Sequence, residues 1–109
     1  MHAFRAAGGV IHYREDGDRG GLPVVFANSL GSDLRVWDAM AAALPKRLRL
    51  IRYDKRGHGL SDCPPGPYTI EGLADDLAAL LDHLEVDRAL VVGLSIGGLI
   101  AQSLADRRP

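Results

Sequence analysis

The sequence has little of several features that mark particular classes of protein. It contains one cysteine, Cys63, so it cannot form an internal disulfide or build a thiolate metal site alone. That count fits a reducing compartment, and we expect a cytoplasmic protein. Lys and Arg number 13 against 14 Asp and Glu, and the net charge is −1. Without excess positive charge, neither nucleic acid nor an anionic membrane is expected as a partner.

Long apolar runs are also missing. The first 14 residues lack the continuous apolar stretch of a signal peptide, so we expect no targeting segment. Residues 89–105 carry no charge, but Gly93, Ser95, Gly97 and other small or polar residues interrupt them. This pattern favours a buried strand, a tight turn and a buried helix over a membrane span.

Short apolar runs alternate with helical patterns along the chain. Residues 24–27, 48–53 and 89–92 read as buried strands, and an apolar helical stripe follows each. In the middle stripe leucines recur at helical spacing, and Thr69 is placed to cap that helix. The other two stripes consist of Trp37, Met40, Ala41 and Leu44, and of Ile96, Leu99, Ile100 and Leu104.

The fold class predicted by this alternation is α/β, with a mostly parallel sheet and helices on both faces. An antiparallel hairpin around Gly8 and Gly9 precedes it, and the charged residues 14–21 are expected to form a loop. The strand at 89–92 would be an edge, apolar on both faces, which proteins usually avoid. We therefore expect residues 1–109 to be the N-terminal portion of a single, larger domain.

The segment Gly93-Leu94-Ser95-Ile96-Gly97 has the G-x-S-x-G spacing of a nucleophile elbow. In such an elbow a strained turn between strand and helix exposes a serine hydroxyl, and its tightness requires glycine on both sides. Ser95 is the candidate nucleophile. The N–H of Ile96, at the start of a helix, is a candidate oxyanion donor. The alternative is a glycine-rich turn with a capping serine.

A second segment, Asn28-Ser29-Leu30-Gly31, ends the first predicted parallel strand. This architecture places the loop that donates the other oxyanion amide there, and the N–H of Leu30 is the candidate. On these four residues alone, an ordinary strand-to-helix turn is the favoured reading.

With these segments, the chain resembles the α/β-hydrolases, and within them the 3-oxoadipate enol-lactonases. The resemblance covers nearly the whole chain and is carried by residues 28–31, Trp37, 52–61, 64–69 and 93–98. It implies hydrolysis of 3-oxoadipate enol-lactone, a step in aromatic-compound catabolism, by a Ser nucleophile through an acyl-enzyme. It implies a small-molecule lactone as substrate and no metal or organic cofactor. Many relatives have His-Gly where this chain has Asn28-Ser29.

The catalytic triad of this family runs in the order Ser, acid, His. After Ser95 only Asp106 is acidic, and all four histidines precede Ser95. The chain alone is therefore expected to be inactive. His58 is expected in a structural loop, His12 on an edge strand and His83 in solvent, and the acids Asp54, Asp75 and Asp76 are expected to be loop or surface charges.

Two other classes of function remain open. One is a different serine α/β-hydrolase, such as an esterase, a perhydrolase or a carbon–carbon bond hydrolase. The other is a non-catalytic module that keeps the elbow as scaffold.

Overall fold

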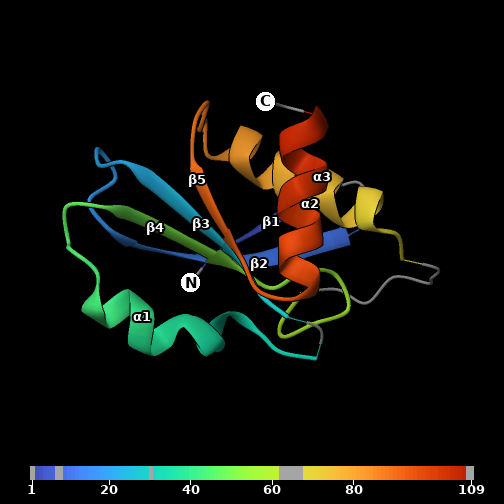
Figure 1. Ribbon diagram of the computed structural model, residues 1–109, viewed down its shortest axis with the longest axis horizontal. Helices are drawn as coiled ribbons and strands as arrows, with labels where there is room; N and C mark the ends of the chain where they lie inside the picture. Colours follow the sequence, from blue (N-terminus) through green and yellow to red (C-terminus); the bar gives the residue numbers. More distant parts are fainter. Residues whose placement is uncertain (1, 7–8, 30, 62–67, 108–109) are drawn as a thin grey trace.

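Five strands form one mixed sheet in the order β1-β2-β4-β3-β5 (Figure 1). A computed structural model describes residues 2–6, 9–29, 31–61 and 68–107. Strands β3, β4 and β5 are parallel to one another, whereas β2 runs antiparallel to both β1 and β4. The elements are β1 (His2–Ala6), β2 (Gly9–Gly17), β3 (Pro23–Ala27), η1 (Leu34–Trp37), α1 (Asp38–Ala43), β4 (Arg49–Tyr53), α2 (Ile70–His83), β5 (Leu90–Gly93) and α3 (Ile96–Arg107).

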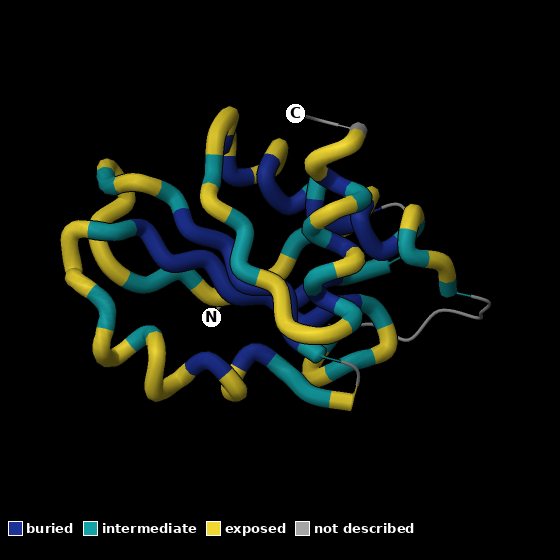
Figure 2. The backbone as a smooth tube through the Cα atoms, viewed as in Figure 1, coloured by how far each residue is buried: buried dark blue, intermediate teal, exposed yellow. Residues whose placement is uncertain are grey.

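Helices cover both faces of the sheet, as the α/β reading predicts. Figure 1 shows α1 on one face and α2 with α3 on the other. Because side chains alternate along a strand, β3 supplies both cores. Val24 and Phe26 pack with Trp37 beneath α1, and Val25 and Ala27 join the larger core beneath α2 and α3. In Figure 2 the central strands are the most continuously buried part of the chain.

The charged segment expected to form a loop is partly a strand. β2 continues through residues 14–17 and pairs with β4, in the register Glu15↔Ile51. Arginines on β4 compensate the acidic side chains of this stretch: Arg49 lies 2.8 Å from Glu15, and Arg52 lies 2.8 Å from Asp16. These ion pairs join residues more than 30 positions apart, so local composition gives no sign of them.

The predicted amphipathic helix is confirmed as α2. The Thr69 hydroxyl accepts a hydrogen bond from the Gly72 N–H at 2.9 Å and caps the helix. Its apolar stripe is buried at Leu73, Leu77, Leu80, Leu81 and Leu84. The stripes of α1 and α3 are less regular than predicted, because Met40 and Leu99 are exposed.

The direction of the connections reverses beside β3. From β3 the chain passes through η1 and α1 to β4, then returns through α2 to β5 on the other side of β3. In α/β sheets such a switch point opens a crevice at the carboxyl ends of the strands, where ligands bind. Here those ends lead into Asn28, Asp54 and Leu94. Within the described ranges, no helix has both the length and the apolar character that crossing a membrane requires.

Candidate active site

The turn between β5 and α3 holds Ser95 in a strained conformation. Its φ is +56°, in the left-handed region that side chains other than glycine rarely adopt. The turn is fixed at both ends: the Leu94 N–H donates to the Ala27 carbonyl at 3.0 Å, and the Gly98 N–H donates to the Ser95 carbonyl at 2.9 Å. Ser95 is exposed. This conformation holds a hydroxyl clear of the sheet and in reach of a ligand.

Glycine is sterically required on both sides of Ser95, as the sequence predicts. A Cβ atom at Gly93 would lie 2.4 Å from the Gly97 carbonyl oxygen. At Gly97 a Cβ atom would lie 2.0 Å from the Ala27 carbonyl oxygen. Both obstacles are backbone atoms, which cannot rotate away. The close approach of α3 to the end of β3 thus depends on the missing side chain at Gly97.

The Ile96 N–H lies at the first residue of α3. Backbone N–H groups in the first turn of a helix have no carbonyl within the helix to bind, and the helix dipole favours negative charge there. The position suits a developing oxyanion on a group bound to Ser95. The second predicted donor, Leu30, lies outside the described residues.

The turn after β3 is organised by its own polar side chains. Asn28 is buried, and its Nδ2 donates to the Ser32 hydroxyl at 3.2 Å. That hydroxyl donates in turn to the Ser29 carbonyl at 2.7 Å. The turn lies next to the elbow because β3 and β5 are paired in the register Ala27↔Gly93.

Two side chains from the loop after β4 reach across to the same turn. Lys55 donates from Nζ to the carbonyl oxygens of Asn28 at 3.2 Å and Ser29 at 2.6 Å. Burial lowers the pKa of Lys55 to about 8, and the adjacent Asp54 carboxylate opposes that shift. His58 Nε2 accepts a hydrogen bond from the Gly31 N–H at 3.0 Å. The sequence reasoning missed Lys55, since nothing in the local pattern distinguishes a buried lysine from an exposed one.

His58 belongs to a loop, as the sequence predicts. Its Nδ1 lies 3.1 Å from the Arg56 carbonyl oxygen while Nε2 binds Gly31, which fixes the tautomer with the proton on Nδ1. Both ring nitrogens are therefore occupied by the backbone. His58 is not placed to act as a base toward Ser95.

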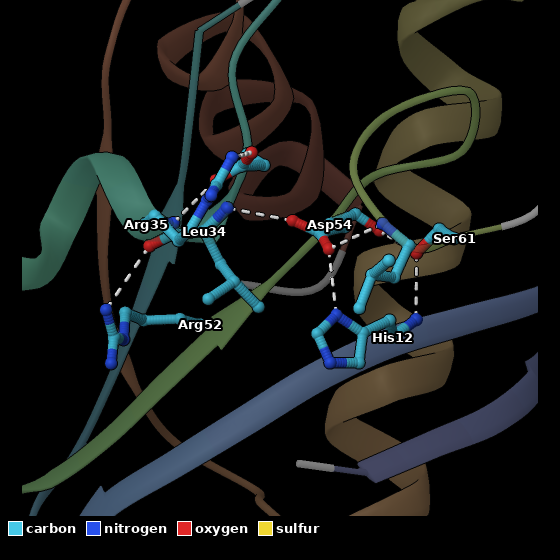
Figure 3. A network of polar contacts seen from close by, with 8 residues as sticks. His12, Leu34, Arg35, Arg52, Asp54 and Ser61 are labelled. Carbon is cyan, nitrogen blue, oxygen red and sulfur yellow. Dashed lines mark hydrogen bonds and ion pairs between the residues drawn. The ribbon is translucent and has the colours of Figure 1, made fainter.

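Asp54 lies in the loop after β4, one of the two places expected for it, but it is buried and connects three segments (Figure 3). Its carboxylate accepts from the N–H of Leu34 at 2.8 Å and of Leu60 at 3.0 Å. It also lies 2.8 Å from His12 Nδ1. A buried carboxylate with three hydrogen-bond partners fixes the loop after β4 against β2 and η1.

Two further expectations were wrong. His12 does not lie on an edge strand: β2 runs between β1 and β4, and His12 is buried against Asp54. Asp76 is not a surface charge either. It is buried and receives Arg56 through two hydrogen bonds, of 2.6 and 2.7 Å. Asp75 is exposed, as expected for a surface charge.

His83 is exposed, as predicted, and stacks on Phe4 with ring centroids 5.0 Å apart. Asp106, the one acid after Ser95, is exposed in the last turn of α3, roughly 16 Å along the helix from the elbow at 1.5 Å per residue. Within the described ranges, no histidine or carboxylate is hydrogen-bonded to the Ser95 hydroxyl.

The part of the chain that matches known proteins includes the parallel strands, the elbow and the helix described above. The α/β-hydrolase fold family matches residues 23–109, from the first residue of β3 through the elbow and α3. The chain belongs to the α/β-hydrolase fold family.

Three relatives are similar to this chain over most of its length. 3-Oxoadipate enol-lactonase 2 of Acinetobacter baylyi is 41% identical over 99 residues, which are 91% of this chain and 37% of the relative. The crystal structure of the enol-lactonase from Burkholderia xenovorans LB400 is 49% identical with a TM-score of 0.91, over 97% of this chain and 42% of that one. Est816, described as an N-acyl homoserine lactone degrading enzyme, is 38% identical with a TM-score of 0.92, over 99% and 41%. The chain thus spans about two fifths of the length of these relatives.

Proposed function

We propose that this hydrolase, in its full-length form, opens 3-oxoadipate enol-lactone to 3-oxoadipate with Ser95 as the nucleophile. The observation that carries the proposal is the conformation of Ser95, which is exposed at φ +56°. It lies between two glycines, at both of which backbone atoms leave no room for a side chain. A strained non-glycine residue persists where the surrounding structure imposes it, and such strain clusters at functional sites.

The proposed reaction is an acyl transfer. The Ser95 Oγ attacks the lactone carbonyl carbon while its proton passes to a general base, and the N–H groups of Ile96 and Leu30 bind the oxyanion. Collapse of the tetrahedral intermediate breaks the ring C–O bond, and the enol that leaves takes up a proton and tautomerises to the ketone. Water then hydrolyses the acyl-enzyme. A hydroxyl, two amides, a base and water suffice for these steps, so we expect no metal or organic cofactor.

The base is proposed to come from outside residues 1–109. Both ring nitrogens of His58 are hydrogen-bonded to backbone groups, and His12 is hydrogen-bonded to the buried Asp54. In this family the histidine follows the nucleophile in the chain. We therefore expect the 109-residue chain alone to be inactive.

The substrate assignment rests on the relatives. Those named 3-oxoadipate enol-lactonase are 41% and 37% identical to this chain, and the enol-lactonase of known structure is 49% identical. The likeness to Est816, described as degrading N-acyl homoserine lactones, supports a second candidate, a lactonase that acts on those lactones. Both candidates share the elbow and the acyl transfer.

The test compares the full-length protein and Ser95→Ala on 3-oxoadipate enol-lactone, an N-acyl homoserine lactone and p-nitrophenyl acetate. We expect the enol-lactone to give the highest kcat/KM, and Ser95→Ala to lower kcat by about 10⁴–10⁶. A fluorophosphonate should label Ser95 in the unmodified protein. Activity retained by Ser95→Ala would refute the nucleophile, and a higher kcat/KM on another ester would refute the substrate.

A further inference from the structure

The turn after β3 is held from outside by the loop after β4. The Lys55 ammonium binds two successive carbonyl oxygens of the turn, and His58 binds the Gly31 N–H. These contacts hold backbone groups on both sides of residue 30. The turn is therefore fixed by two side chains that come from a loop 26 or 27 residues further along the chain.

Burying Lys55 has a cost that packing alone does not explain. The residue is 1% exposed. Among the described residues its ammonium forms no ion pair, and its hydrogen-bond partners are the two backbone carbonyls. A charged group removed from water without a counter-ion is destabilising, and an apolar side chain of the same length would fill the space. The interactions that offset this cost are the hydrogen bonds to the two carbonyls of the turn.

The same turn lies against the elbow. The Ala27 carbonyl accepts the Leu94 N–H at 3.0 Å, and a Cβ at Gly97 would lie 3.0 Å from the Asn28 carbonyl oxygen. The turn after β3 and the start of α3 therefore lie directly against each other, next to Ser95.

We propose that Lys55 is a positioning residue for the oxyanion-binding turn: its ammonium fixes the peptide groups after Asn28 and Ser29, and so the direction of the amide that the turn offers to the oxyanion. The inference rests on the proposed function. A trans peptide group is planar, so a contact that fixes a carbonyl oxygen also restrains the plane of the whole peptide group. A cation on the carbonyl oxygen holds that plane and polarises the amide, which makes its N–H a stronger donor.

The test is Lys55→Met in the full-length protein, with Lys46→Met as the matched control because Lys46 is exposed. The measurements are kcat and KM on 3-oxoadipate enol-lactone and the rate of Ser95 labelling by a fluorophosphonate. We expect Lys55→Met to lower kcat and the labelling rate by about 10²–10³, the effect of losing one oxyanion donor, with KM changed less than about threefold. Lys46→Met should leave all three unchanged. A purely structural lysine would lower the urea midpoint and leave kcat of the folded enzyme intact.

A second measurement needs no variant. Because the pKa of Lys55 is about 8, the labelling rate of the unmodified protein should fall between about pH 7 and pH 9 as the ammonium becomes a neutral amine and a weaker donor. Asp54 is the charged group beside it that opposes the loss of the proton. A rate that stays constant or rises between pH 7 and pH 9 overturns the inference.

The outcomes separate the two proposals. Unchanged kcat and labelling in Lys55→Met, with Ser95→Ala inactive, overturns the role of Lys55 and leaves the proposed function standing. No labelling of Ser95 in the unmodified protein overturns the proposed function and this inference with it.

Discussion

A methyl group added at Gly97 should destabilise the protein far more than one added at the next residue. Both glycines lie in the first turn of α3, and neither has a positive φ, so both backbones accept alanine. At Gly98 the nearest atom to a Cβ would be the Gly93 carbonyl oxygen at 3.9 Å, an ordinary contact. At Gly97 it would be the Ala27 carbonyl oxygen at 2.0 Å. The pair separates steric fit from helix propensity.

The expected size follows from what must move. Favourable contacts of carbon lie at about 3.5–4.0 Å, so Gly97→Ala must push α3 and the end of β3 apart by more than about 1 Å. Overpacking of this kind costs about 1–3 kcal/mol. Moving the Ala27 carbonyl also weakens its bond to the Leu94 N–H, worth about 1 kcal/mol. Gly98→Ala should instead stabilise by about 0.5–1 kcal/mol through helix propensity.

Urea unfolding of the two full-length variants, followed by circular dichroism, measures the difference. We expect Gly97→Ala to lower the free energy of unfolding by about 2–4 kcal/mol, a large part of the roughly 5–15 kcal/mol that a domain has. The m-value should stay the same. If Gly97→Ala were as stable as Gly98→Ala, the close approach of α3 to β3 would be refuted, and with it the geometry of the elbow.

Two further predictions concern other parts of the molecule. Asp76→Asn should destabilise by about 3 kcal/mol because it leaves the part-buried Arg56 without its counter-ion, whereas Asp75→Asn, on the exposed side of α2, should change stability by less than about 0.5 kcal/mol; equal urea midpoints would refute the role of the ion pair. Residues 1–109 expressed alone should self-associate and show no lactonase activity, because Leu90, Leu94 and Leu99 on and beside the edge strand β5 are 57%, 47% and 52% exposed. Analytical ultracentrifugation measures this, and a monomer with a cooperative melt would contradict it.

The elements that the sequence predicts well are those whose pattern is local. The α2 leucines recur at the helical period, and every one of them is buried. The apolar run at residues 24–27 became β3, whose alternate side chains enter the two cores. The elbow is also local, since glycine, serine and glycine at fixed spacing between a strand and a helix describe one turn. Pattern reasoning succeeds here because each pattern lies within a short stretch of sequence, even where the contact that requires it is distant in the chain, as between Gly97 and the Ala27 carbonyl oxygen.

The polar side chains that organise the site follow a different rule. Arg52 is buried because Asp16, Asp38 and the Leu34 carbonyl surround it, and none of these is near it in sequence. The continuation of β2 through its charged residues has the same origin. Whether a charge is buried depends on a partner that only the fold brings close. The charged residue type alone therefore predicts an exposed position, whereas the structure places the side chain in the interior.

The loop after β4 shows what this means for function. Asp54 and Lys55 are adjacent, oppositely charged and both buried, yet they serve different segments. Asp54 binds β2 and the start of η1, and Lys55 binds the turn after β3. A displacement of this loop would therefore be transmitted to the turn beside the elbow, although no side chain among the loop's described residues is hydrogen-bonded to Ser95. Substitutions in the loop should accordingly lower kcat more than they change substrate affinity. The groups that they move are those proposed to bind the transition state and not the ground state.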